Sequence, residues 1–120
     1  MTVNLLQLQK LGVWTAYHAI GEESAGEAAS LVEELGYGTF WLGGSPKLAQ
    51  IRPLLEATER LTVATAIVNV WQNEPATLAG EYAALAEEFP DRVLLGIGVG
   101  HPEATSDYSK PLSTMRSFST

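Results

Sequence analysis

Two histidines are the side chains of this 120-residue chain best suited to moving a proton near neutral pH. His18 follows an apolar segment at 11–17, and His101 follows another at 93–99. At the end of a strand, either imidazole could act as a general acid or base. His101 is the stronger candidate because it follows a glycine run, whereas His18 is more simply a solvated loop residue. With no cysteine and two histidines, the sequence predicts neither a thiolate nucleophile nor a dedicated transition-metal site.

The glycine run lies in the segment LGIGVGHP at 95–102. A dinucleotide-binding fingerprint needs the spacing G-x-G-x-x-G directly before a helix, but Gly96, Gly98 and Gly100 are spaced G-x-G-x-G. Nucleotide binding of the Rossmann type is therefore disfavoured. Glycines at the end of a strand more simply allow a flat ligand or a neighbouring backbone to come close. No G-x-S-x-G motif is present, so a hydrolase has no support.

Two further residues could line a binding site near the end of the apolar stretch at 61–70. Asn69 could hydrogen-bond a ligand, or it could be a buried amide satisfied by neighbouring backbone. Trp71 falls past the end of that stretch and could form the wall of an apolar pocket. The other tryptophans, Trp14 and Trp41, lie within apolar stretches and are expected in the core.

Strand-like and helix-like segments alternate along the chain. The spacing of apolar residues predicts strands at 11–17, 39–42, 61–70 and 93–99, and helices at 22–36, 46–55 and 75–89. Ser45 is the expected cap of the second helix, with Pro46 in its first turn. The glutamates of the first helix lie largely off its apolar face and are expected on the solvated surface. Alternation of this kind predicts a parallel sheet with helical crossovers.

Two α/β architectures fit this order, an open doubly wound sheet or an arc of a (β/α)₈ barrel. A complete barrel takes about 250 residues. Residues 1–120 therefore make one domain, and as a barrel they would form its N-terminal half, with about four strands and three to four helices. In such barrels the active site lies at the carboxyl ends of the strands, which is where His18 and His101 are expected.

Composition narrows the class of partner. Apolar residues make up 46% of the chain and charged residues 18%, which is typical of a globular protein. The net charge of −7 disfavours binding to nucleic acid or to an anionic membrane. No apolar run reaches the roughly 18 residues of a membrane span, and residues 1–10 lack the features of a signal peptide. The cytoplasm is the expected location.

Several segments together resemble the luciferase-like monooxygenase superfamily, and in particular its deazaflavin-dependent oxidoreductase branch. They are LGVW at 11–14, LVEELGYGTFWLGG at 31–44, LLEATERLTVATAIVNVW at 54–71, FPDRVLLGIGVGHP at 89–102 and KPLSTMR at 110–116. The resemblance covers nearly the whole chain. It implies the N-terminal half of a (β/α)₈ barrel that binds deazaflavin (coenzyme F-420), or alternatively FMN, at the carboxyl ends of its strands.

The resemblance also implies roles for individual residues. The cofactor-binding residues would be Ala66, Ile67, Asn69, Gly98 and Gly100. A non-proline cis peptide is expected at Ala66–Ile67, because the superfamily carries one where TAIVN lies. Several deazaflavin enzymes have an Asp-His pair after the second strand, but this chain has Gly43-Gly44-Ser45 there. His101 falls where some relatives place a glutamate, which makes it the expected catalytic proton donor.

The function expected from the resemblance is hydride transfer between a deazaflavin or flavin and a small organic substrate. The chain is expected to act in a homo-oligomer or together with a separate C-terminal half, and to be inactive as an isolated monomer. The alternative is a non-catalytic half-barrel that acts only through self-association.

Overall fold

The computed structural model describes residues 5–100 and 109–119, in which a parallel sheet is backed by helices. The strands are β1 (Gly12–Ala16), β2 (Thr39–Gly43), β3 (Thr62–Thr65), β4 (Val68–Asn69), β5 (Val93–Leu94) and β6 (Ile97–Gly98). The main sheet has the order β1-β2-β3-β5, and β4 pairs with β6 beyond it. Every pair is parallel. The predicted α/β class with a parallel sheet is therefore confirmed, and the strands lie side by side in chain order, as in an arc of a barrel.

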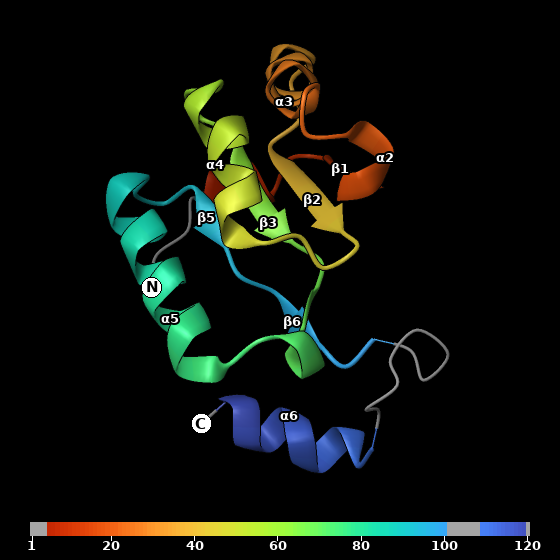
Figure 1. Ribbon diagram of the computed structural model, residues 1–120. Helices are drawn as coiled ribbons and strands as arrows, with labels where there is room; N and C mark the ends of the chain where they lie inside the picture. Colours follow the sequence, from red (N-terminus) through yellow and green to blue (C-terminus); the bar gives the residue numbers. More distant parts are fainter. Residues whose placement is uncertain (1–4, 101–108, 120) are drawn as a thin grey trace.

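Helices follow one another around one face of this sheet (Figure 1). They are α1 (Leu5–Leu8), α2 (Tyr17–Ile20), α3 (Ala25–Glu34), α4 (Leu48–Glu56), the 3₁₀ turn η1 (Val70–Gln72), α5 (Pro75–Glu88) and α6 (Pro111–Ser119). In Figure 1, α3, α4 and α5 back the strands in chain order, while α6 lies apart, below β6. None of the described helices is both long and apolar enough to cross a membrane.

The hydrophobic core lies between the sheet and these helices. Alternate strand residues such as Phe40, Leu42 and Val63 point into it and are buried. The opposite face of the sheet bears Trp14 and Trp41, which lie in register on β1 and β2. No helix covers this second face in the part of the chain that the structure describes (Figure 1). The sheet of a (β/α)₈ barrel has the same arrangement, because one of its faces packs against the helices and the other faces the barrel axis.

Two of the predicted strands are interrupted. The segment at 61–70 divides into β3 and β4 at Ala66–Ile67, and the segment at 93–99 divides into β5 and β6 at Gly96. Hydrogen bonds of the Thr65 side chain and of the backbone connect the strands at these breaks. The Thr65 hydroxyl donates to Gly96 O and accepts from Gly96 N, both at 2.9 Å, and Val68 N donates to Gly96 O at 2.8 Å. The apolar pattern predicted a continuous strand at 93–99, which is wrong, whereas the break in 61–70 falls at Ala66–Ile67, where the family resemblance implied a cis peptide.

The predicted start of the second long helix is also wrong. The helix begins at Leu48, and Lys47 rather than Ser45 is its cap residue. Ser45 has a φ of 53°, in the left-handed region, and its hydroxyl accepts a hydrogen bond from Asn69 N at 2.9 Å. The serine therefore connects the end of β2 to β4 instead of capping the helix.

Glu33 of α3 is not simply a solvated surface residue, contrary to the prediction. Its carboxylate accepts hydrogen bonds from the backbone N–H groups of Glu59, at 3.1 and 3.2 Å, and of Arg60 and Leu61, both at 2.7 Å. Partial burial raises the pKa of the Glu33 carboxyl, but these donors and the Arg60 charge outweigh burial and hold the pKa below its ordinary value. Glu33 thus fixes the loop that leads into β3.

Replacing Glu33 with glutamine is expected to lower the free energy of unfolding by about 1–3 kcal/mol at neutral pH, because the carboxylate is the acceptor for three donors. A lowered folded-state pKa stabilises the fold above the unfolded value of about 4.3, and this contribution is lost as the pH falls through the folded value. Urea unfolding between neutral pH and about pH 3 should therefore show the difference between wild type and Glu33→Gln shrinking on acidification.

The matched control is Glu34→Gln, at the exposed neighbouring position of α3. It should change the unfolding free energy by less than about 0.5 kcal/mol. Equal effects of the two substitutions, or a constant difference across the pH range, would contradict the role assigned to Glu33.

Candidate functional site

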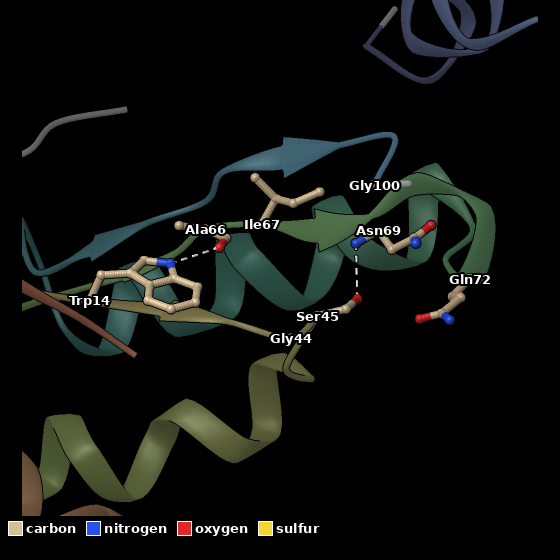
Figure 2. A pocket seen from close by; sticks show the side chains of 8 residues that line it. All are labelled: Trp14, Gly44, Ser45, Ala66, Ile67, Asn69, Gln72 and Gly100. Carbon is tan, nitrogen blue, oxygen red and sulfur yellow. Dashed lines mark hydrogen bonds between the residues drawn. The ribbon is translucent and has the colours of Figure 1, made fainter. Parts of the chain in front are cut away.

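A cavity of about 440 Å³ opens at the carboxyl ends of the strands, on the face of the sheet away from the helices. Its lining residues are Trp14, Gly44, Ser45, Ala66, Ile67, Asn69, Gln72 and Gly100. They come from β1, the loop after β2, the break between β3 and β4, the end of β4, η1 and the segment after β6. Figure 2 shows Trp14 at one end of the cavity and Gln72 at the other. This is the edge at which the active sites of (β/α)₈ enzymes lie.

One wall of the cavity is aromatic and is held in place on two sides. The indole Nε1–H of Trp14 donates a hydrogen bond to Ala66 O at 3.2 Å (Figure 2). The ring lies against Gly43, where a Cβ atom would come within 2.3 Å of Trp14 Cζ2. Position 43 therefore leaves room for the indole only as glycine.

The other end of the cavity is polar and well ordered. Asn69 N donates to Ser45 Oγ at 2.9 Å (Figure 2), and Asn69 Oδ1 accepts from Trp71 N at 2.7 Å. Asn73 Nδ2 donates to Asn69 O at 2.8 Å. The side chain of Asn69 thus caps η1, as expected for an amide satisfied by neighbouring backbone, and the residue also lines the cavity.

The glycines of the run at 96–100 make room for neighbouring residues. A Cβ on Gly98 would come within 2.4 Å of Ile67 Cδ1, and a Cβ on Gly96 within 2.3 Å of Thr65 O. Of the two alternatives weighed for these glycines, Gly96 shows the close approach of a neighbouring backbone, whereas Gly98 makes room for the Ile67 side chain. Gly100 lines the cavity itself.

The predicted cofactor-binding residues lie together. Ala66, Ile67, Asn69 and Gly100 line the cavity, and Gly98 lies behind Ile67. The predicted cis peptide at Ala66–Ile67 is confirmed. His101, the predicted proton donor, lies outside the described residues, so its role stays a prediction. His18 is exposed in α2 beside Gly44, where a Cβ would lie 3.3 Å from its Nδ1, and it is not part of the cavity lining.

Sequence reasoning expected Trp14 and Trp41 in the core, but both lie on the opposite face of the sheet, and it missed three lining residues. Trp14, expected in the core, is 60% exposed and lines the cavity. Trp71, which could have formed a pocket wall, is not part of the cavity lining, and its Nε1–H donates to Val99 O at 2.7 Å. Ser45 and Gln72 were not proposed as site residues, nor was Gly44. The position of Gln72 just after Asn69 and Trp71 was the one available signal, because residues at the end of a barrel strand gather at the site.

The lining carries no acidic, basic or histidine side chain among the described residues. The hydrogen-bonding groups it presents are hydroxyl, amide and backbone groups, and the rest of its surface is aromatic or aliphatic. A cavity of this size is within the range of roughly 300–1,000 Å³ typical of small-molecule sites. Such a lining fits an uncharged, flat, aromatic ring with polar edges. In the part of the chain that the structure describes, no group of three or more His, Asp or Glu residues could hold a metal ion.

Comparison with known proteins agrees with this geometry. A family model described as luciferase-like monooxygenase matches residues 1–117. The chain is 35% identical over 63 residues to an F420-dependent glucose-6-phosphate dehydrogenase from Tsukamurella paurometabola, a match that covers 52% of this chain and 18% of that protein.

Solved structures show the same fold at low sequence identity. The oxygenating constituent of 3,6-diketocamphane monooxygenase from Pseudomonas putida, in complex with FMN, superposes with a TM-score of 0.75 at 15% identity, over 91% of this chain and 38% of that one. The monooxygenase RslO1 from Streptomyces bottropensis gives a TM-score of 0.75 at 18% identity, over 92% and 41%. The chain thus spans less than half the length of these relatives, as the predicted partial barrel requires, and it belongs to the luciferase-like monooxygenase family.

Proposed function

We propose that this chain supplies the cofactor-facing part of a deazaflavin-dependent oxidoreductase, with FMN as the alternative cofactor. The observation that carries the proposal is the cavity at the carboxyl ends of the strands, which combines an aromatic and aliphatic wall with hydroxyl and amide groups. Family membership adds support, because one relative is F420-dependent by name and another was solved with FMN.

The reaction we assign to the complete barrel is hydride transfer between the cofactor and a small organic substrate. When bound, a deazaflavin supplies a ring carbon that accepts or releases the hydride. In this proposal Ile67 excludes water from one side of the ring. Ser45, Asn69 and Gln72 present polar groups to its edge, and His101 exchanges the proton that accompanies the hydride.

We also propose that the chain works in an assembly. The sheet face that bears Trp14 is uncovered, and β1 and β5 have no second partner strand among the described residues. Unpaired strand edges favour pairing with another chain. A second copy, or a chain carrying the remaining strands of the barrel, would cover this face and close the cavity.

Titration with coenzyme F420 and with FMN tests the proposed function. Both are added to the chain at tens of micromolar, and bound cofactor is measured by equilibrium dialysis while light scattering records the assembly state. We expect saturable binding of one cofactor, with the bound fraction in the assembled species. Absence of binding of both would contradict the proposal and favour the alternative, a non-catalytic half-barrel that only self-associates.

A further inference from the structure

We propose that Trp14 is a cofactor-contacting residue, whose indole forms the wall against which the ring system of the bound deazaflavin or flavin packs. This inference rests on the proposed function and adds to it a residue on β1, outside the set of cofactor-binding residues predicted from the sequence. It concerns the one aromatic side chain of the cavity lining within the described residues.

The exposure of Trp14 is unusual for its position. The side chain is 60% exposed, although it belongs to a strand of the main sheet and its neighbour in register, Trp41, is half-buried. The other large apolar side chains exposed to this degree in the described part of the chain are leucines. A tryptophan buries a large apolar area when a ligand covers it, so an exposed indole at a cavity favours binding of an apolar or aromatic group.

The indole is also held rigidly, as a binding wall requires. Nε1–H is committed to Ala66 O, and Gly43 provides the space in which the ring lies (Figure 2). A side chain fixed before the ligand arrives loses little conformational entropy when the ligand binds. The hydrogen bond also ties β1 to the segment at Ala66–Ile67, so the aromatic wall and the aliphatic wall keep a constant separation.

The polar groups of the site lie where they complement this wall. Ser45, Asn69 and Gln72 are at the end of the cavity away from Trp14 (Figure 2). A ring packed on the indole would therefore direct its carbonyl and N–H edge toward hydroxyl and amide groups. Aromatic contact with polar edge recognition is the arrangement by which proteins bind flat heteroaromatic rings.

Emission of the bound cofactor tests the inference, because an indole in contact with a flavin or deazaflavin quenches the fluorescence of the ring. FMN and coenzyme F420 are titrated separately into wild type, Trp14→Leu, Trp14→Phe and Trp41→Phe, with affinity taken from equilibrium dialysis. We expect the cofactor bound to the wild-type chain to fluoresce weakly. Trp14→Leu should bind the cofactor about tenfold more weakly, and the bound cofactor should fluoresce more strongly than in the wild type.

Trp14→Phe keeps an aromatic wall but loses the bond to Ala66 O, so its affinity should fall less than that of Trp14→Leu while the emission still rises. Trp41→Phe is the matched control and should change neither affinity nor emission, because Trp41 does not line the cavity.

If Trp14→Leu does not fold, as judged by thermal melting, the emission of the cofactor bound to Trp14→Phe decides the test. Tight binding by wild type with unchanged emission in the Trp14 variants overturns this inference and leaves the proposed function standing. Absence of binding by wild type overturns both.

Discussion

At micromolar concentration the chain is expected to sediment as a dimer or a larger assembly, not as a monomer. The physical reason is the surface that the half-barrel leaves uncovered. β1 and β5 are the edges of the described main sheet, and Trp14 lies exposed on the face opposite the helices. An open strand edge beside exposed apolar surface favours pairing with another chain. The net charge of −7 on each copy opposes association only in part, and salt screens this repulsion.

The helix layer also exposes apolar side chains, near the end of α3. Leu31 of α3 and Leu35, the residue that caps the end of this helix, lie one turn apart and are 55% and 65% exposed. α3 packs against α4 on one side. In a closed barrel, the last helix of the ring would pack on its other side. Leu35→Glu places a charge in that contact and is expected to weaken the assembly at least tenfold, because burying a leucine contributes about 1.5–3 kcal/mol.

Leu112→Glu is the matched control for this substitution. Leu112 lies on α6, is 74% exposed and receives the same change of charge. Sedimentation equilibrium should show the control assembling as wild type does and Leu35→Glu shifting toward monomer. A wild-type chain that is a folded monomer at tens of micromolar, or a Leu112→Glu effect as large as that of Leu35→Glu, would show that this surface is not an interface.

The sequence predicted well those features that depend on local pattern. The first two predicted strands, at 11–17 and 39–42, correspond closely to β1 and β2, and the third long helix begins at Pro75 with Glu74 as its cap. Each of these elements combines a strong apolar periodicity with a recognisable start, which is information carried by neighbours in the chain. The parallel pairing of the strands then followed from the alternation of strands and helices.

The features that sequence patterns did not predict depend on contacts between distant segments. The breaks at Ala66–Ile67 and Gly96 lie within uniformly apolar stretches, and the bonds that join them cross 31 positions in the chain. Ser45 has the residue type of a helix cap, yet its hydroxyl accepts from Asn69 N, 24 positions away. Trp14 is a large aromatic residue within an apolar segment, which is typical of a core position. Whether its face of the sheet is covered depends on segments distant in the sequence or on another chain, and the local sequence pattern does not determine this.

Thr65→Val is expected to destabilise the fold by about 2–3 kcal/mol, because it leaves the Gly96 N–H without its acceptor and removes a second hydrogen bond. The Thr65 hydroxyl is buried and both donates to and accepts from Gly96, at 2.9 Å in each direction. Valine has nearly the same volume but offers neither a donor nor an acceptor. Since these bonds join β3 to the segment between β5 and β6, the cavity walls carried by β4 should also lose order.

Thr62→Val is the matched control, three residues earlier on the same strand. The Thr62 hydroxyl is buried without a hydrogen-bond partner, so replacing it with a methyl group removes an unsatisfied polar atom. Its unfolding free energy should be unchanged or higher, which is the opposite sign from Thr65→Val. Urea unfolding of both variants gives the stabilities, and equilibrium dialysis with coenzyme F420 or FMN gives the affinities. If Thr65→Val costs no more than Thr62→Val, the hydroxyl bonds to Gly96 do not stabilise the fold. If Thr65→Val alone lowers both stability and cofactor affinity, these bonds position the site.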